Sequence, residues 1–171
     1  MKKSLVFLPI NPDNISHCNA FTYLMKRYIA EMNRHSHRPL PEEFQQKWID
    51  SILSAQGPKD SHLELCYAGN ALVGFLYGKV DHPEHKGYTR PGHGYIMEFY
   101  IEPEHRRKGY GSQMFHRLDA MFRADGVIQM YLTADPVTGK PFWEAMGFVN
   151  SGMYSPNNQL LIYERYVTET D

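Results

Sequence analysis

The spacing of apolar residues predicts three strands and two helices in the first half of the chain. Phe21, Leu24 and Met25 recur at helical spacing and form part of one apolar stripe. Gly69-Asn70 separates two apolar runs and suits a hairpin turn. The expected elements are a strand over residues 4–10, a helix from Asn14 or Ser16 to Met32, a helix over residues 42–53, and strands over residues 62–68 and 71–80. In the second helix, the apolar side is expected to consist of Phe44, Trp48, Ile49 and Ile52.

The second half alternates strands with helices. Residues 81–94 form a loop rich in His, Pro and Gly. Further along the chain, Met114, Leu118 and Phe122 belong to a stripe of apolar residues at helical spacing. The expected elements are strands over residues 95–101, 127–133, 148–154 and 160–167, and helices from near Gly109 to Asp125-Gly126 and over residues 138–146. The order β-α-α-β-β-β-α-β-α-β-β predicts an α/β (α+β) fold, with helices covering a mixed sheet in one domain over residues 1–171.

The most informative segment is residues 101–112, where a strand stops at Pro103, turns through basic residues and opens a helix on two glycines. The N-terminus of a helix exposes backbone N–H groups and carries about half a positive charge, which suits a phosphate or pyrophosphate. Gly109 and Gly111 allow the backbone to approach such an anion. The segment predicts a site for a phosphorylated cofactor, against the alternative of an ordinary basic turn capped by glycine.

This segment also matches a family signature. The spacing Arg106-x-x-Gly109-x-Gly111 resembles the Q/R-x-x-G-x-G/A loop of GNAT-type N-acetyltransferases, and residues 142–148 resemble the family's F-Y-E-x-x-G-F segment. Two other phosphate motifs are excluded, since the third glycine of a dinucleotide fingerprint is missing and no G-x-x-x-x-G-K-S/T occurs. The resemblance covers about residues 94–150. It implies a mixed, mostly antiparallel central sheet flanked by helices.

The resemblance further implies that the chain binds acetyl-CoA as a cosubstrate. The glycine loop would hold the pyrophosphate, and backbone groups of the strand over residues 95–101 would hold the pantetheine arm. One of those N–H groups would also polarise the thioester carbonyl. The implied cofactor-binding residues are Phe99, Tyr100, Ile101, Arg106, Arg107, Lys108, Gly109, Tyr110, Gly111 and Ser112.

Glu98 is the candidate catalytic residue. It interrupts an apolar strand, where an unpaired buried carboxylate would be costly. In the family that the chain resembles, an acidic residue at this end of the fourth strand commonly faces the substrate amine. Burial would raise the pKa of Glu98 toward the range that a general base needs. The alternative is that Glu98 pairs with a core Arg, Tyr or His and only stabilises the sheet.

The general acid is where the sequence departs from the family's pattern. Trp143 stands where the family often has a tyrosine, and we expect it to pack, because an indole N–H is a poor proton donor. Tyr131 and Tyr154 are alternative donors. Unaided departure of a thiolate is also tolerable, since the pKa of a thiol is about 8.5. Asp135-Pro136 occupies the region where the family frequently has an asparagine.

Net charge, cysteine content and the length of apolar runs argue against several other classes of protein. The formal net charge of −1 opposes a nucleic-acid partner, which needs a basic excess. Cys18 and Cys66 lie far apart and indicate no disulfide framework. No apolar run approaches the roughly 18 residues of a membrane span, and the short run after Met1 is no convincing secretory leader, so we expect a cytoplasmic protein without a membrane partner.

The histidines lie in two loop clusters and do not predict a metal site. Metal sites usually hold their ligands on rigid elements, whereas these loops are rich in glycine and proline. The loop over residues 81–94 is instead a candidate wall of the acceptor pocket. The clustered histidines are His35, His37, His82, His85 and His93.

We therefore expect an N-acetyltransferase that transfers an acetyl group from acetyl-CoA to a primary amine of a small molecule or peptide by direct attack, without a metal. The sequence does not decide between these acceptors or whether the acyl group is strictly acetyl, and a homodimer is compatible with it. The alternative is a non-catalytic acyl-CoA-binding or regulatory module. Trp143 and the missing asparagine motivate that alternative.

Overall fold

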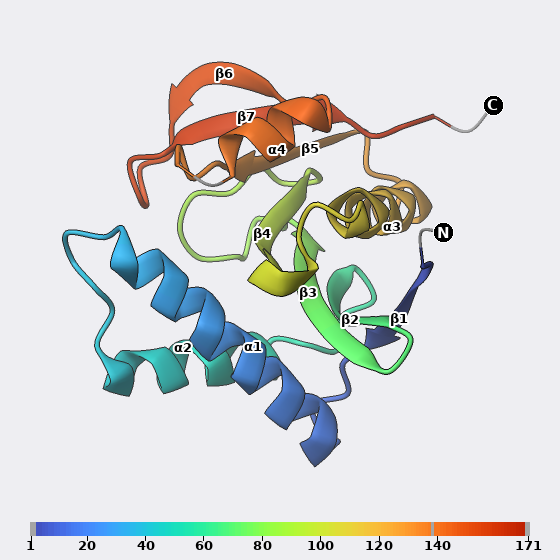
Figure 1. Cartoon of the computed structure of the whole chain (residues 1–171). Helices are drawn as coiled ribbons and strands as arrows, with labels where there is room; N and C mark the ends of the chain where they lie inside the picture. The colour runs from blue at the N-terminus through green and yellow to red at the C-terminus, as the bar shows by residue number, and fades with distance from the viewer. Residues whose placement is uncertain (1–2, 138, 170–171) are drawn as a thin grey trace. The chain divides into compact units, whose positions relative to one another are not determined.

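The computed structural model describes residues 3–137 and 139–169 (Figure 1). Its helices and strands follow the predicted order, with one turn of 3-10 helix added before the third helix. The helices are α1 (Ile15–Arg34), α2 (Glu42–Ser54), η1 (Pro103–His105, the 3-10 turn), α3 (Tyr110–Ala124) and α4 (Lys140–Ala145). The strands are β1 (Leu5–Pro9), β2 (Ser61–Ala68), β3 (Ala71–Val80), β4 (Gly94–Ile101), β5 (Gln129–Thr133), β6 (Val149–Tyr154) and β7 (Leu161–Tyr166).

Across the described residues, hydrogen bonds join seven strands in the order β1-β2-β3-β4-β5-β7-β6. β4 and β5 run parallel and pair Gly94 with Met130 and Tyr95 with Tyr131. The pairs β1–β2, β5–β7 and β6–β7 are antiparallel. The predicted mixed, mostly antiparallel sheet is confirmed.

The chain packs as two compact units. The first unit contains the residues up to Tyr77 together with Glu98–Gly111, and the second contains Gly78–Met97 and the residues from Ser112 onward. Both β3 and β4 therefore contribute residues to each unit.

In the first unit, α1 covers the strands with its apolar stripe. Asn14 begins the helix, since its Oδ1 accepts hydrogen bonds from the backbone N–H groups of Ser16 and His17 at 3.0 and 3.2 Å. The ring of Phe21 meets Phe75 of β3 edge-on, with the ring centroids 5.1 Å apart. The buried residues of the helix are Phe21, Leu24, Met25 and Ile29.

The prediction for α2 was wrong at Phe44, which was expected on the buried side and is 47% exposed. The buried residues of α2 are Ile49 and Ile52. Phe44 lies about 140° around the helix axis from Ile49, because an α-helix advances about 100° per residue. Its ring instead lies beside Lys47, whose Nζ is 5.4 Å from the ring centroid.

The end of β4 lies very close to β3 within the first unit. A Cβ built on Gly74 of β3 would overlap the carbonyl oxygen of Tyr100, so only glycine fits there. The backbone N–H of Glu102 then donates to the carbonyl oxygen of Val73 at 2.9 Å. These contacts hold the strand end from which Glu98 and Tyr100 project.

In the second unit, α3 buries the predicted stripe against the strands. Leu118 of this stripe lies against β3, because a Cβ built on Gly78 would be 3.0 Å from its Cδ1. The helix predicted over residues 138–146 is α4, and Thr138 lies outside the described residues. The stripe residues Met114, Phe115, Leu118 and Phe122 are fully buried.

Candidate functional site

The chain passes from β4 into α3 through η1 and residues 106–109 (Figure 1). Gly109, directly before α3, has a φ of 81°, and Arg107 has a φ of 63°. Residues in this left-handed region, placed close together, turn backbone N–H groups into a concave site that suits an anion. The first turn of α3 adds N–H groups that have no partner within the helix. The role of this turn as a pyrophosphate site stays a prediction.

Arg106 anchors this loop to α1. Its Nη1 and Nη2 donate to the two carboxylate oxygens of Glu31 at 2.9 and 2.6 Å, and its Nε donates to the carbonyl oxygen of Ile101 at 2.8 Å. Such a bidentate pair fixes both position and orientation. The guanidinium of Arg106, which the resemblance implies as a cofactor contact, is therefore engaged in holding the loop.

The other two basic residues of the loop are exposed. Lys108 donates from Nζ to the carbonyl oxygen of Glu104 at 3.0 Å. Arg107 extends from the left-handed backbone position. Tyr110, which begins α3, is 7% exposed, so its side chain is buried at the start of that helix.

Glu98 keeps part of its surface accessible to solvent, while its carboxyl group accepts a hydrogen bond from Tyr28 of α1. Burial raises the pKa of Glu98 from 4.5 to about 7, and outweighs the hydrogen bond from Tyr28, which lowers it. An arginine or protonated histidine partner would have lowered this pKa. A carboxyl group that titrates near neutral pH can both accept and release a proton.

Tyr100 lies on the same face of β4 as Glu98, because side chains alternate along a strand. Its ring centroid is 5.4 Å from that of Tyr28, so Tyr28 contacts both residues. Burial raises the pKa of Tyr100 to about 12, and the phenol stays neutral. Tyr28 was not predicted as a site residue, because it falls at helical spacing with Leu24 and Met25 and so fits the apolar stripe of α1. The available signal was its hydroxyl, because a buried tyrosine hydroxyl usually finds a partner.

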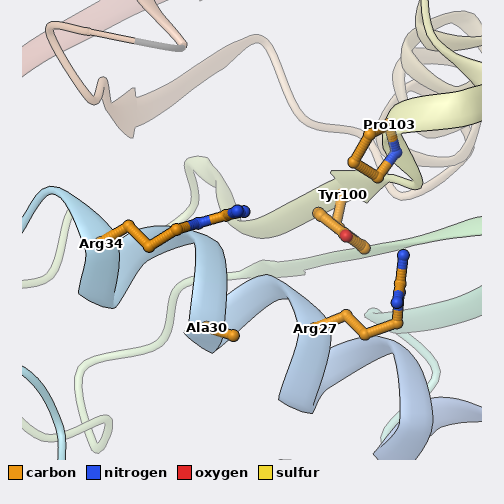
Figure 2. Close-up of a pocket in the computed structure, with 5 residues that line it drawn as sticks. All are labelled: Arg27, Ala30, Arg34, Tyr100 and Pro103. Atoms are coloured by element: carbon orange, nitrogen blue, oxygen red, sulfur yellow. The ribbon is translucent and has the colours of Figure 1, made fainter.

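A pocket of about 370 Å³ lies between α1 and the end of β4 (Figure 2). The Nε of Arg27 is 2.7 Å from the Oε2 of Glu102, whose side chain is 3% exposed. Figure 2 shows the side chain of Arg34 extended toward Tyr100. The sequence did not predict this pocket, since a basic residue in the last turn of a helix is common. The residues that line it are Arg27, Ala30, Arg34, Tyr100 and Pro103.

The three aromatic residues considered as proton donors lie in the second unit. Trp143 is 7% exposed, and its ring packs edge-on against Phe148 at 5.3 Å. Tyr131 is 1% exposed, its hydroxyl donates to the carboxylate of Asp81, and burial followed by this bond raises its pKa strongly. Tyr154 is 63% exposed on β6. The indole of Trp143 is therefore a packing group. Tyr131 is a weaker proton donor than an ordinary tyrosine, because its pKa is raised.

Asp81 organises the loop that follows β3. Its Oδ2 accepts a hydrogen bond from the backbone N–H of Arg90 at 3.0 Å, and its Oδ1 is 3.8 Å from the Nδ1 of His85. The guanidinium of Arg90 also reaches Glu164 at 2.7 Å. Among residues 3–137 and 139–169, no group of three or more His, Cys, Asp or Glu is arranged to hold a metal ion. The role of this loop at the acceptor stays a prediction.

Solved structures share the fold of this chain at low sequence identity. The PaiA N-acetyltransferase of Thermoplasma acidophilum, solved with coenzyme A, has a TM-score of 0.70 at 15% identity, covering 95% of this chain and 99% of that one. An acetyltransferase of Thermus thermophilus has a TM-score of 0.66 at 22% identity, covering 96% and 98%. A ribosomal-protein alanine N-acetyltransferase of Escherichia coli has a TM-score of 0.63 at 11% identity, covering 98% and 96%.

At the level of sequence, a search of curated proteins finds no match for this chain. In the described part of the chain, no helix combines the length and the apolar character of a membrane span. The model of the acetyltransferase (GNAT) family matches residues 24–148, which is most of the chain. The chain therefore belongs to the GNAT acetyltransferase family.

Proposed function

We propose that the chain is an acetyl-CoA-dependent N-acetyltransferase that acetylates a primary amine of a small molecule or peptide by direct attack. One observation carries the proposal beyond family membership. Glu98, whose pKa is about 7, stands on the strand that leads directly into a turn with the geometry of a pyrophosphate site. This arrangement supports a proton acceptor and an anion site on one short stretch of chain.

The residues at the end of β4 fit coenzyme A. The N–H groups around Gly109 and the start of α3 would hold its pyrophosphate, with Arg107 adding an exposed charge. Peptide groups of Phe99, Tyr100 and Ile101 would hold the pantetheine arm. The carbonyl of Ile101 already accepts a hydrogen bond from Arg106, so this carbonyl is engaged before any cofactor binds. When bound, acetyl-CoA supplies an acetyl group activated as a thioester.

Glu98 would take the proton of the attacking amine. An alkyl ammonium group has a pKa of about 10.4, so nearly all of the acceptor amine is protonated at neutral pH. The amine must lose that proton before its nitrogen can attack the thioester. A carboxylate with a pKa of about 7 accepts that proton at neutral pH, directly or through a water molecule. Tyr28 keeps the carboxyl group oriented. A backbone N–H of β4 would polarise the thioester carbonyl, and the thiolate would leave unaided, because the pKa of a thiol is about 8.5.

A second candidate function is a non-catalytic acyl-CoA-binding module. The packed indole of Trp143, where the family often has a tyrosine, favours it. Under this reading coenzyme A would bind at the same loop, and Glu98 would have no reactive partner.

Thiol release from acetyl-CoA in the presence of a panel of amines separates the two functions. The panel contains primary alkyl amines, free amino acids and peptides with free amino termini or lysines. We expect release that depends on at least one amine and yields an acetylated product by mass spectrometry. Glu98→Gln serves as the matched control, since it keeps the shape of the side chain and removes its basicity. Calorimetric binding of coenzyme A without turnover of any amine would favour the module.

A further inference from the structure

The pocket between α1 and the end of β4 contains one arginine whose charge is not compensated (Figure 2). Arg27 is bonded to the carboxylate of Glu102 at 2.7 Å and lies 3.9 Å from that of Glu104. In the described part of the chain, Arg34 has no ion pair or hydrogen bond through its guanidinium. The pocket therefore presents one free guanidinium beside one that is already paired.

Three acidic residues, Glu31, Glu102 and Glu104, lie on or beside the elements that form this pocket, and in the part of the chain that the structure describes none of them pairs with Arg34. Glu31 on α1 lies three residues before Arg34, and both of its carboxylate oxygens accept from Arg106. Glu102 accepts from Arg27. No acidic side chain is among the residues described as lining the pocket. An external carboxylate is the group that would complete Arg34, because a guanidinium matches the two oxygens of a carboxylate in a planar, bidentate arrangement.

The pocket opens on the face of β4 that carries the proposed base. Tyr100 forms one wall of the pocket and lies two residues after Glu98, so both side chains project on the same face. Tyr28 joins them, with its hydroxyl on Glu98 and its ring 5.4 Å from that of Tyr100. A molecule seated against Tyr100 and Arg34 would therefore be on the side of the strand where Glu98 takes its proton.

We propose that Arg34 binds a carboxylate of the acceptor, and that the acceptor is an amine that also carries a carboxylate, such as an amino acid. This inference rests on the proposed function, because it uses Glu98 to identify the acceptor side. The ring of Tyr100, Ala30 and Pro103 would contact the apolar part of the same molecule. The 3′-phosphate of coenzyme A has related anionic chemistry, and the test below separates the two.

The test compares amines that differ only by a carboxylate. Matched pairs are tyrosine with tyramine, lysine with cadaverine, and histidine with histamine, with kcat/KM measured by thiol release. The wild type should prefer the carboxylate-bearing member of a pair. Arg34→Gln should reduce that preference about tenfold or more, mainly through KM, because one charged hydrogen bond contributes about that factor. Its kcat/KM on the decarboxylated member should fall less than its kcat/KM on the carboxylate-bearing member.

Arg38→Gln is the matched control. Both Arg34 and Arg38 are exposed, but Arg38 lies in the loop after α1 and outside the pocket, so its loss should leave the preference intact. Binding of the same six compounds, measured by calorimetry with coenzyme A present, gives a readout that needs no turnover. Equal binding and equal rates for the two members of every pair would overturn the proposal.

Other outcomes also contradict the proposal, each in its own way. If Arg34→Gln weakens binding of coenzyme A and leaves dephospho-coenzyme A unaffected, the pocket holds the phosphate of the cosubstrate. If Arg34→Gln only lowers thermal stability and keeps the preference, Arg34 serves the helix terminus. Failure of the proposed function is distinguishable from all of these, since no amine would then release thiol with the wild type or any variant.

Discussion

Replacing Gly109 by valine is the sharpest test of the proposed pyrophosphate site. Gly109 has a φ of 81°, in the left-handed region, immediately before α3. A residue with a Cβ loses about 1–2 kcal/mol in that region, and a branched side chain loses more. Gly109→Val should therefore lower the free energy of unfolding by at least this amount, or shift the loop to a different backbone conformation.

The effect on coenzyme A affinity should be larger than the effect on stability. A hydrogen bond to a charged group contributes about 1.5–3 kcal/mol. Displacing one backbone N–H from the pyrophosphate would thus raise Kd about 10- to 150-fold. Arg107→Ala keeps a Cβ at a φ of 63°, so it leaves the backbone strain unchanged and removes one exposed charge. Its Kd should rise less than about fivefold.

Calorimetric titration of coenzyme A into each variant at one fixed salt concentration checks these values. Gly109→Asn is the matched control for strain, because asparagine tolerates the left-handed region better than valine does. It should fold like the wild type and still bind weakly, since its Cβ obstructs the approach of the anion. Wild-type affinity in Gly109→Val, or a greater loss in Arg107→Ala, would refute the assignment of the contact to the backbone.

Three further outcomes are expected. Burial raises the pKa of Glu98 from 4.5 to about 7, so the native chain keeps a proton that the unfolded chain loses. The free energy of unfolding of the wild type should therefore fall by up to about 3 kcal/mol as the pH rises from 4.5 through about 7. In Glu98→Gln the free energy of unfolding should depend less on pH, as measured by urea unfolding at about pH 5 and 8. Trp143→Ala should lower the free energy of unfolding by about 3–5 kcal/mol, whereas Trp143→Tyr should keep the fold; a folded but inactive Trp143→Phe would contradict the packing role. Acetylation should persist after exhaustive chelation, and loss with EDTA followed by rescue with zinc would count against metal-free chemistry.

Local patterns were sufficient to predict most of the fold. β3 runs over Ala71–Val80, as expected from an apolar run that begins after a turn pair. Asn14 caps α1 because its side chain reaches the next N–H groups along the chain. Such signals lie within a few residues of the feature that they determine. Phe44 was misplaced because a pattern of apolar residues does not show which side of a short helix meets a neighbour.

The site was predicted less completely, because its decisive contacts join distant parts of the sequence. Arg106 was expected to face the anion, whereas its partner Glu31 lies 75 residues away and is visible only after folding. The hydrogen bond from Tyr28 to Glu98 likewise joins residues that are far apart in the sequence and meet only in the folded chain. The resemblance was assigned to about residues 94–150, and the family model extends it back to residue 24. Variable helices carry little sequence signal even where they build one wall of a site.

The pH dependence of kcat/KM in Glu98→Gln tests the central claim most directly. With an amine identified by the thiol-release panel, the wild-type profile should bend near pH 7, where the carboxyl group of Glu98 titrates. The variant should lose about 10²- to 10⁴-fold in turnover at neutral pH, and the loss should shrink at high pH as free amine accumulates. Unchanged turnover of Glu98→Gln from pH 6 to 9 would show that Glu98 is not the base.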